Sequence, residues 1–170
     1  MSWVDEIRNS VPGYAKDISL NLDAVVNRST LDEVMVKGVC LAAAFAAGNM
    51  DLVRQIKQYM LEEDRNAALT AAGLMAMNNI WYPYVEMAAD PALKGLPAQL
   101  RMNAYATHGG TTKARFEAYA LAASIVGKCH FCVKSHYDTL RKEGLTVEQL
   151  RDIGRIAAVV GAASRMIDGA

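Results

Sequence analysis

Signals that start and stop helices recur along almost the whole chain. Thr30 with Glu33 has the spacing of a capping box, in which two residues satisfy each other's backbone at a helix N-terminus. Thr146 with Gln149 repeats that spacing, and Gly48 stands where a helix would end. Between these signals apolar residues follow helical spacing, and no stretch alternates apolar and polar residues for long enough to predict a strand.

Apolar residues make up 52% of the chain but aromatic residues only 7%, which favours closely packed helices over a β-sandwich. The sequence therefore predicts an all-α fold.

These signals divide the chain into a series of helices. The least regular part is 80–97, which contains three of the 4 prolines, and we expect it to form a long loop with a broken turn. Pro97 then suits the first position of a short helix that runs to about Ala106. The other helices are expected over 3–10, 14–27, 31–47, 50–61, 64–79, 113–127, 128–143 and 147–168.

A segment near the middle of the chain resembles one closer to the C-terminus. Residues 41–50 read LAAAFAAGNM and residues 121–129 read LAASIVGKC, so they correspond with one residue of gap. An Ala-rich helix is expected after each segment. We therefore predict a single domain over 1–170 built from a duplicated helical unit, with a degenerate half at about 30–80 and the half that carries the chemistry at about 112–168.

Charge and hydropathy argue against several classes of protein. The 18 Lys and Arg balance the 18 Asp and Glu, and no basic block predicts a nucleic-acid surface. The first residues include acids at once and do not resemble a signal peptide. The longest apolar run, 39–47, is far shorter than the roughly 20 residues that span a bilayer. We therefore expect a cytoplasmic protein that binds neither nucleic acid nor membrane.

The chemistry is predicted at a Cys-x-x-Cys pair, Cys129 and Cys132, followed by His136. Positions i, i+3 and i+7 of one helix lie on the same face, so the three side chains are expected together. Cys129 stands at the helix start, where unpaired N–H groups and the positive end of the helix dipole stabilise a thiolate. His136, however, points back toward Cys132 one turn away and would accept its proton, directly or through a water. We therefore assign Cys132 as the attacking thiolate and Cys129 as its partner and proton donor.

Glu117 is the candidate that would act on the histidine. It lies in the preceding predicted helix, between Phe116 and the mostly apolar run 118–123. A carboxylate in such surroundings would orient His136 and tune its protonation.

Other interpretations of these residues stay open. A Cys-x-x-Cys pair also occurs as half of a zinc site, which needs two further ligands. A third interpretation is a pair of inert buried cysteines. The further zinc ligands would come from Cys40, His108, His130 and His136. Cys40 itself lies in an apolar run and is expected to be a small core residue. We expect His130 to face solvent or a subunit boundary, His108 to lie in a loop, and Met75, Met77 and Met102 to fill the core.

The chain resembles a known family at these residues. Glu117, then Cys129-x-x-Cys132, then His136 match the Glu…Cys-x-x-Cys-x-x-x-His signature of the alkyl hydroperoxidase D (AhpD) proteins, within the carboxymuconolactone decarboxylase superfamily. The resemblance extends over nearly the whole chain, with similar segments at 12–22, 75–79, 100–103 and 136–141.

This resemblance implies a fold, an activity and a set of partners. It implies an all-helical chain that assembles into a homotrimer. It also implies a lipoyl-dependent peroxidase that reduces alkyl hydroperoxides, recycles a partner peroxiredoxin, or does both. Dihydrolipoamide on a lipoylated acyltransferase subunit, kept reduced by lipoamide dehydrogenase, would be the reducing co-substrate. No metal or other cofactor would be bound.

The same resemblance implies a role for each signature residue. Cys132 would become the sulfenic acid and would form the mixed disulfide with the partner. Cys129 would donate a proton and then resolve the intermediate, which closes a Cys129–Cys132 disulfide. Glu117 and His136 would form the proton relay.

The chain departs from some family members at one position, and three rival functions stay open. Where those members place a histidine directly before the second cysteine, this chain has Phe131, and its histidine stands at 130. Phe131 would instead line an apolar approach for a lipoyl chain or an alkyl peroxide. The rivals are a protein-disulfide reductase without peroxidase activity, a decarboxylase or lactone-processing enzyme, and a non-enzymatic metal-binding oligomeric module.

Overall fold

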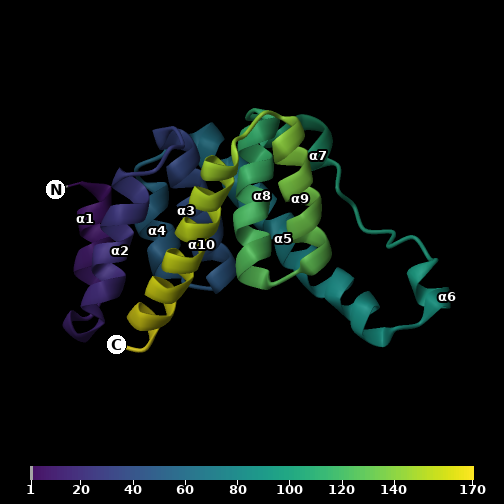
Figure 1. The fold of residues 1–170 in the computed structure, drawn as a ribbon, viewed down its shortest axis with the longest axis horizontal. Helices are drawn as coiled ribbons and strands as arrows, with labels where there is room; N and C mark the ends of the chain where they lie inside the picture. The colour runs from purple at the N-terminus through teal and green to yellow at the C-terminus, as the bar shows by residue number, and fades with distance from the viewer. Residues whose placement is uncertain (1) are drawn as a thin grey trace.

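All the regular structure in the computed structural model, which describes residues 2–170, is helical (Figure 1). None of these residues forms a β-strand, which confirms the predicted all-α class. No helix among them is both long and apolar enough to cross a membrane. The elements, in chain order, are α1 (Trp3–Ser10), η1 (Gly13–Ala15), α2 (Lys16–Asn27), α3 (Glu33–Ala47), α4 (Met50–Lys57), α5 (Glu62–Ala88), α6 (Pro91–Lys94), α7 (Ala104–Thr107), η2 (His108–Gly110), α8 (Lys113–Gly127), α9 (His130–Lys142) and α10 (Val147–Asp168).

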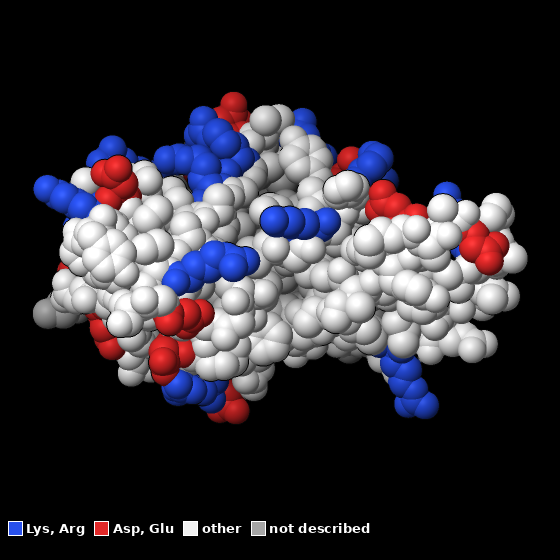
Figure 2. Space-filling model, turned by 90° about the horizontal axis from the view of Figure 1, so that it is seen from below, with Lys and Arg blue, Asp and Glu red and all other residues white. Residues whose placement is uncertain are grey.

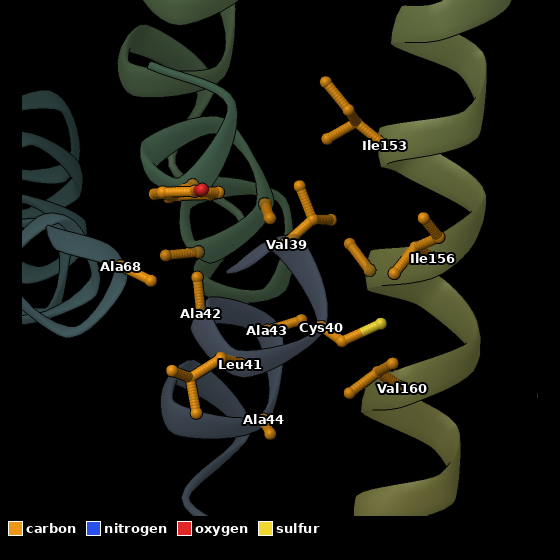
Figure 3. Packing of buried hydrophobic residues seen from close by; sticks show 14 of the residues in the cluster. Val39, Cys40, Leu41, Ala42, Ala43, Ala44, Ala68, Ile153, Ile156 and Val160 are labelled. Carbon is orange, nitrogen blue, oxygen red and sulfur yellow. The ribbon is translucent and has the colours of Figure 1, made fainter. Parts of the chain in front are cut away.

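The centre of the molecule is the crossing of α3 with α8, two helices of 15 residues each. α5 and α10 each pack against both of them. Many of the buried residues in these helices are alanines, whose small side chains let the helices approach closely. Figure 3 shows larger side chains of α3 and α10 that meet in this core, among them Val39, Cys40, Ile153, Ile156 and Val160.

The remaining helices divide between the two ends of the molecule (Figure 1). At the N-terminal end, α1 packs against α2 and α4. On the other side of the centre, α9 packs against α8 and α5. Beyond α9 the last turns of α5 lead into α6 and an extended return, which protrude from the body and end at α7 (Figure 1). We call residues 80–102 the arm.

The predicted loop over 80–97 is wrong over its first half, because α5 continues through Pro83 to Ala88, and α6 adds a short helix at Pro91–Lys94. A proline inside a helix removes one backbone hydrogen bond, and its ring crowds the preceding turn. Side-chain packing offsets that loss here. Tyr82 stacks on Phe131 of α9, with the ring centroids 4.4 Å apart. The helix therefore continues because a neighbouring element packs against it.

The predicted capping role of Thr30 is also wrong. The residue that caps α3 is Asp32, whose carboxylate accepts a hydrogen bond from the N–H of Met35 at 2.9 Å. Thr30 instead donates hydrogen bonds from its N–H and its hydroxyl to Asp152 of α10, at 2.8 and 2.9 Å. Thr30 thus joins distant parts of the chain.

The short helix expected from Pro97 to Ala106 is wrong over most of its length. Helix α7 begins only at Ala104. Gln99 takes a left-handed backbone conformation, with φ 53°, which interrupts any helix that starts at Pro97.

The two halves of the predicted duplication have matching helix ends. α3 and α8 both end at a residue in the left-handed conformation, Gly48 and Lys128. Asn49 then caps α4 with its side chain, as Cys129 caps α9. This pairing sets Asn49, rather than Met50, opposite Cys129, one residue from the expected register. The duplication itself stays a prediction.

Candidate active site

The two cysteines of the pair start α9. Cys129 is the N-cap residue, and its sulfur accepts a hydrogen bond from the N–H of Cys132, with Sγ 3.2 Å from N. A disulfide joins Cys129 to Cys132. Lys128, with φ 55°, ends α8 and turns the chain directly into α9. A tight connection between two packed helices therefore holds the pair at a helix start.

His136 lies one turn after Cys132 and is paired with Glu117 of α8. Nδ1 of His136 is 2.6 Å from Oε2 of Glu117. Both side chains are buried, with 9% and 7% of their surface exposed. Because α8 and α9 pack side by side, the structure brings the four residues of the signature onto two adjoining helices.

The other ring nitrogen of His136 has two partners that sequence reasoning missed. Nε2 lies 3.4 Å from the hydroxyl of Tyr105 on α7 and 3.1 Å from Sδ of Met75 on α5. The Tyr105 ring stacks on the imidazole, with centroids 6.1 Å apart, and meets Phe116 edge-on at 5.1 Å. Met75 is fully buried, as expected of core filler, yet its sulfur also contacts the candidate base. Met75 opens one of the segments shared with the family, but no sequence pattern marks either residue as a partner of His136.

The expected contact between His136 and Cys132 is not formed while the disulfide is closed. Within residues 2–170, the hydrogen bonds of His136 go to Glu117, Tyr105 and Met75. The sulfur of Cys132 is bonded to Cys129 and carries no proton to donate. A contact between the imidazole and the Cys132 thiol of the reduced protein stays a prediction.

Burial controls the electrostatics of the site. The two cysteines, Cys129 and Cys132, are 0% and 2% exposed. Burial strongly raises the pKa of Tyr105, and the negative charge of Glu117 raises it further. The phenol therefore keeps its proton and remains able to donate a hydrogen bond at any physiological pH.

Two asparagines of α5 lie beside the end of α8 and the start of α9. The carbonyl oxygen of Asn78 lies 4.0 Å from Sγ of Cys129. The side-chain amide of Asn79 donates to the carbonyl oxygen of Ala123 at 3.0 Å. A Cβ atom added at Gly127 would collide with Asn79, so a residue without a side chain is needed where α5 passes the end of α8.

A hollow of about 1170 Å³ opens between α9 and the arm. Phe131, between the two cysteines in sequence, lines this hollow and is 57% exposed. His130 lies at the same wall and is exposed to solvent, with Nδ1 3.5 Å from a carboxylate oxygen of Glu86. The other lining residues are largely apolar and include Trp81, Tyr82, Val85, Leu93 and Leu96.

Cys40 and His108, which were considered as further zinc ligands, lie apart from the cysteine pair. Cys40 is buried in α3, and burial raises the pKa of its thiol to about 12, as expected of a core residue. His108 lies in η2 with its ring against Phe116. Among the residues that the structure describes, no group of three or more His, Cys, Asp and Glu side chains is arranged to hold a metal ion.

Comparison with known proteins gives one family and a consistent set of relatives. A model of the carboxymuconolactone decarboxylase family matches residues 91–170. The alkyl hydroperoxide reductase AhpD of Rhodospirillum centenum is 36% identical over 169 residues, which cover 97% of this chain and 90% of that protein. The AhpD of Maricaulis maris is 38% identical over 168 residues, 96% of each chain. The AhpD of Streptomyces avermitilis is 37% identical over 169 residues, 97% of this chain and 95% of that protein. The similarity therefore covers both halves of the chain.

Proposed function

The chain belongs to the AhpD family, within the carboxymuconolactone decarboxylase family, and on that premise we propose that it is a thiol-dependent enzyme that reduces alkyl hydroperoxides. The observation that carries the proposal is the pair of cysteines at the start of α9, joined in a disulfide, with a buried His136–Glu117 pair on the same two helices. A dithiol that closes into a disulfide supplies the two electrons that reduction of one hydroperoxide needs.

The first step oxidises Cys132. In the reduced protein His136 takes the thiol proton of Cys132 at Nε2, and Glu117 stabilises the imidazolium that forms. The Cys132 thiolate attacks the outer oxygen of the hydroperoxide and breaks the O–O bond. The sulfur becomes a sulfenic acid, and the alkoxide that leaves takes the thiol proton of Cys129 to become an alcohol.

The second step closes the disulfide. The Cys129 thiolate attacks the sulfenic sulfur of Cys132, and the hydroxyl group takes the proton held by His136 and leaves as water. An external dithiol then attacks the disulfide, passes through a mixed disulfide at Cys132 and leaves as a disulfide itself. The two cysteines thereby return to thiols. Cys129 is thus both the proton donor and the resolving thiol.

The proposal includes the finer assignments that the family resemblance implies. The dithiol is dihydrolipoamide on a lipoylated acyltransferase subunit, which lipoamide dehydrogenase keeps reduced. A peroxiredoxin of the AhpC type is the protein partner, and its mixed disulfide forms at Cys132. The enzyme works in the cytoplasm as a homotrimer. Phe131 and the apolar hollow it lines would guide the carbon chain of the dithiol or peroxide toward the pair.

Single cysteine variants test the assignment. The reduced Cys129→Ser protein, treated with an organic hydroperoxide and a sulfenic-acid trap such as dimedone, should carry the trap on Cys132 by mass spectrometry. Cys132→Ser should carry none on Cys129, and both variants should lose dihydrolipoamide-dependent peroxide consumption. Cys40→Ala is the matched control and should keep turnover, because Cys40 is buried in the core. Full turnover by Cys132→Ser would refute the assignment.

Comparing hydroperoxide consumption with insulin reduction separates the peroxidase from a general disulfide reductase. That rival uses the same cysteines but would reduce a protein disulfide without consuming hydroperoxide. Wild-type protein that reduces insulin and leaves organic and hydrogen peroxide untouched would contradict the proposal.

A further inference from the structure

Nε2 of His136 lies between a hydrogen-bond donor and a hydrogen-bond acceptor. The hydroxyl of Tyr105 is 3.4 Å away on one side, and the thioether sulfur of Met75 is 3.1 Å away on the other. A phenol can donate to an unprotonated ring nitrogen, whereas a thioether has only lone pairs and accepts from a protonated one. The two neighbours therefore favour opposite protonation states of the same atom.

The positions of both neighbours are set by separate elements. Tyr105 belongs to α7, where the arm returns to the body, and its ring is held edge-on against Phe116 of α8. Met75 belongs to α5 and is fully buried. A phenol oxygen can also accept a hydrogen bond, but the nearer acceptor for a protonated Nε2 is the sulfur. Donation to Nε2 is the interaction that only Tyr105 supplies.

We propose that Tyr105 and Met75 are positioning residues that together set the protonation state of His136: Tyr105 holds Nε2 as a proton acceptor, and Met75 holds it as a donor. The inference rests on the proposed function in one respect. Only an unprotonated Nε2 can take the thiol proton of Cys132, so Tyr105 favours the state that acts as base and Met75 opposes it, and the phenol hydrogen bond gives way when the thiol donates to the single lone pair of Nε2.

The charged groups around His136 act equally on every variant of these two residues. From α8, Oε2 of Glu117 lies 2.6 Å from Nδ1. Lys113, at the start of α8, has its pKa raised by a hydrogen bond to Glu143 and more weakly by the charge of Glu117. α5 and α7 present only the thioether and the phenol to the ring, and in the described chain no group of α10 bonds to it. The disulfide on α9 does not titrate.

The test titrates His136 by NMR in oxidised protein labelled at histidine. The chain has 3 histidines, so the ring signals are few. Tyr105→Phe removes the donor and should raise the pH at which the ring is half-protonated by about 0.5–1 unit, a typical effect of one hydrogen bond. Met75→Leu removes the acceptor and should lower that pH by a similar amount. Tyr119→Phe is the matched control, because the buried Tyr119 hydroxyl has no hydrogen-bond partner in the described structure, and should change nothing.

Opposite shifts in the two variants are the result that a merely structural disturbance would not produce. Shifts in the same direction, or an unchanged midpoint in Tyr105→Phe, would overturn the inference. In reduced protein, the pH profile of peroxide consumption should move in the same direction as the NMR midpoint of each variant. If the midpoints move as expected but wild-type protein consumes no peroxide, the inference stands and the proposed function fails. If wild-type protein consumes peroxide and the midpoints do not move, the inference alone fails.

Discussion

At the scale of single residues, one hydrogen bond ties the helix that carries the cysteines to its neighbour. Glu117 on α8 and His136 on α9 are both buried, and each is the hydrogen-bond partner of the other. A buried polar group that loses its partner is costly, which favours a hydrogen bond that stays formed. The orientation of the imidazole is therefore held from Nδ1, while Nε2 faces Tyr105 and Met75.

The charge of Glu117 should matter more than its size. Glu117→Gln keeps an oxygen that can accept from His136 but removes the negative charge that stabilises the imidazolium. We expect turnover to fall by roughly 10²–10⁴, the range for a lost acid–base group, in steady-state peroxide consumption with dihydrolipoamide. Glu33→Gln is the control, since its exposed carboxylate pairs with Lys37 on α3, away from the cysteines. Wild-type turnover in Glu117→Gln would remove the carboxylate from the relay.

At the scale of helices, the crossing of α3 and α8 depends on one missing side chain. A Cβ atom added at Gly38 of α3 would overlap the ring of Tyr119 on α8. Tyr119 is fully buried among close-packed neighbours, so its ring has little room to move. The same α8 also carries Glu117, so this crossing sets where one half of the buried pair stands.

Gly38→Ala should lower the free energy of unfolding by roughly 1–3 kcal/mol, the usual effect of overpacking a core. This loss should appear although alanine is intrinsically the better helix former by about 1 kcal/mol. Chemical denaturation measures the change. Gly73→Ala on α5 is the matched control, because nothing lies within 4 Å of its added Cβ, and it should stabilise the protein. Stabilisation by both substitutions would mean that the crossing tolerates a wider spacing.

At the scale of the whole molecule, the arm is the feature that a single copy leaves uncovered. Figure 2 shows that the protruding end, at the right of the view, is mostly uncharged. Large exposed apolar surfaces are typical of interaction sites. The proposed homotrimer supplies a partner for it in neighbouring copies of the chain. The exposed apolar side chains of the arm include Ile80, Tyr84, Met87, Leu96 and Leu100.

A charge placed on the arm should break that assembly. Met87 is 78% exposed in the single chain, and Met87→Asp would bury a carboxylate in the proposed interface. Size-exclusion chromatography with light scattering should give three times the 18.4 kDa chain mass for wild type and a smaller species for the variant. Tyr14→Asp is the control, since Tyr14 is 75% exposed at the other end of the molecule. A wild-type mass of one chain would refute the trimer.

The sequence by itself determined the features that depend on near neighbours along the chain. The caps at Thr112 and Thr146 act on backbone groups three residues away, so α8 and α10 begin where expected. The positions of Cys129, Cys132 and His136 on one helix follow from helical geometry alone. The family was recognisable from this spacing together with Glu117 and with similar segments along nearly the whole chain.

Only the tertiary structure decided the features whose partners are distant in the chain. Tyr105 and Met75 reach His136 across 31 and 61 residues, and no local pattern marks such a contact. Thr30 bonds to Asp152 rather than capping the nearest helix. Helix α5 continues past its proline because packing against α9 outweighs a local preference. Local rules weigh a residue against its sequence neighbours, whereas burial and hydrogen bonding in the folded chain depend on groups that the fold alone brings together.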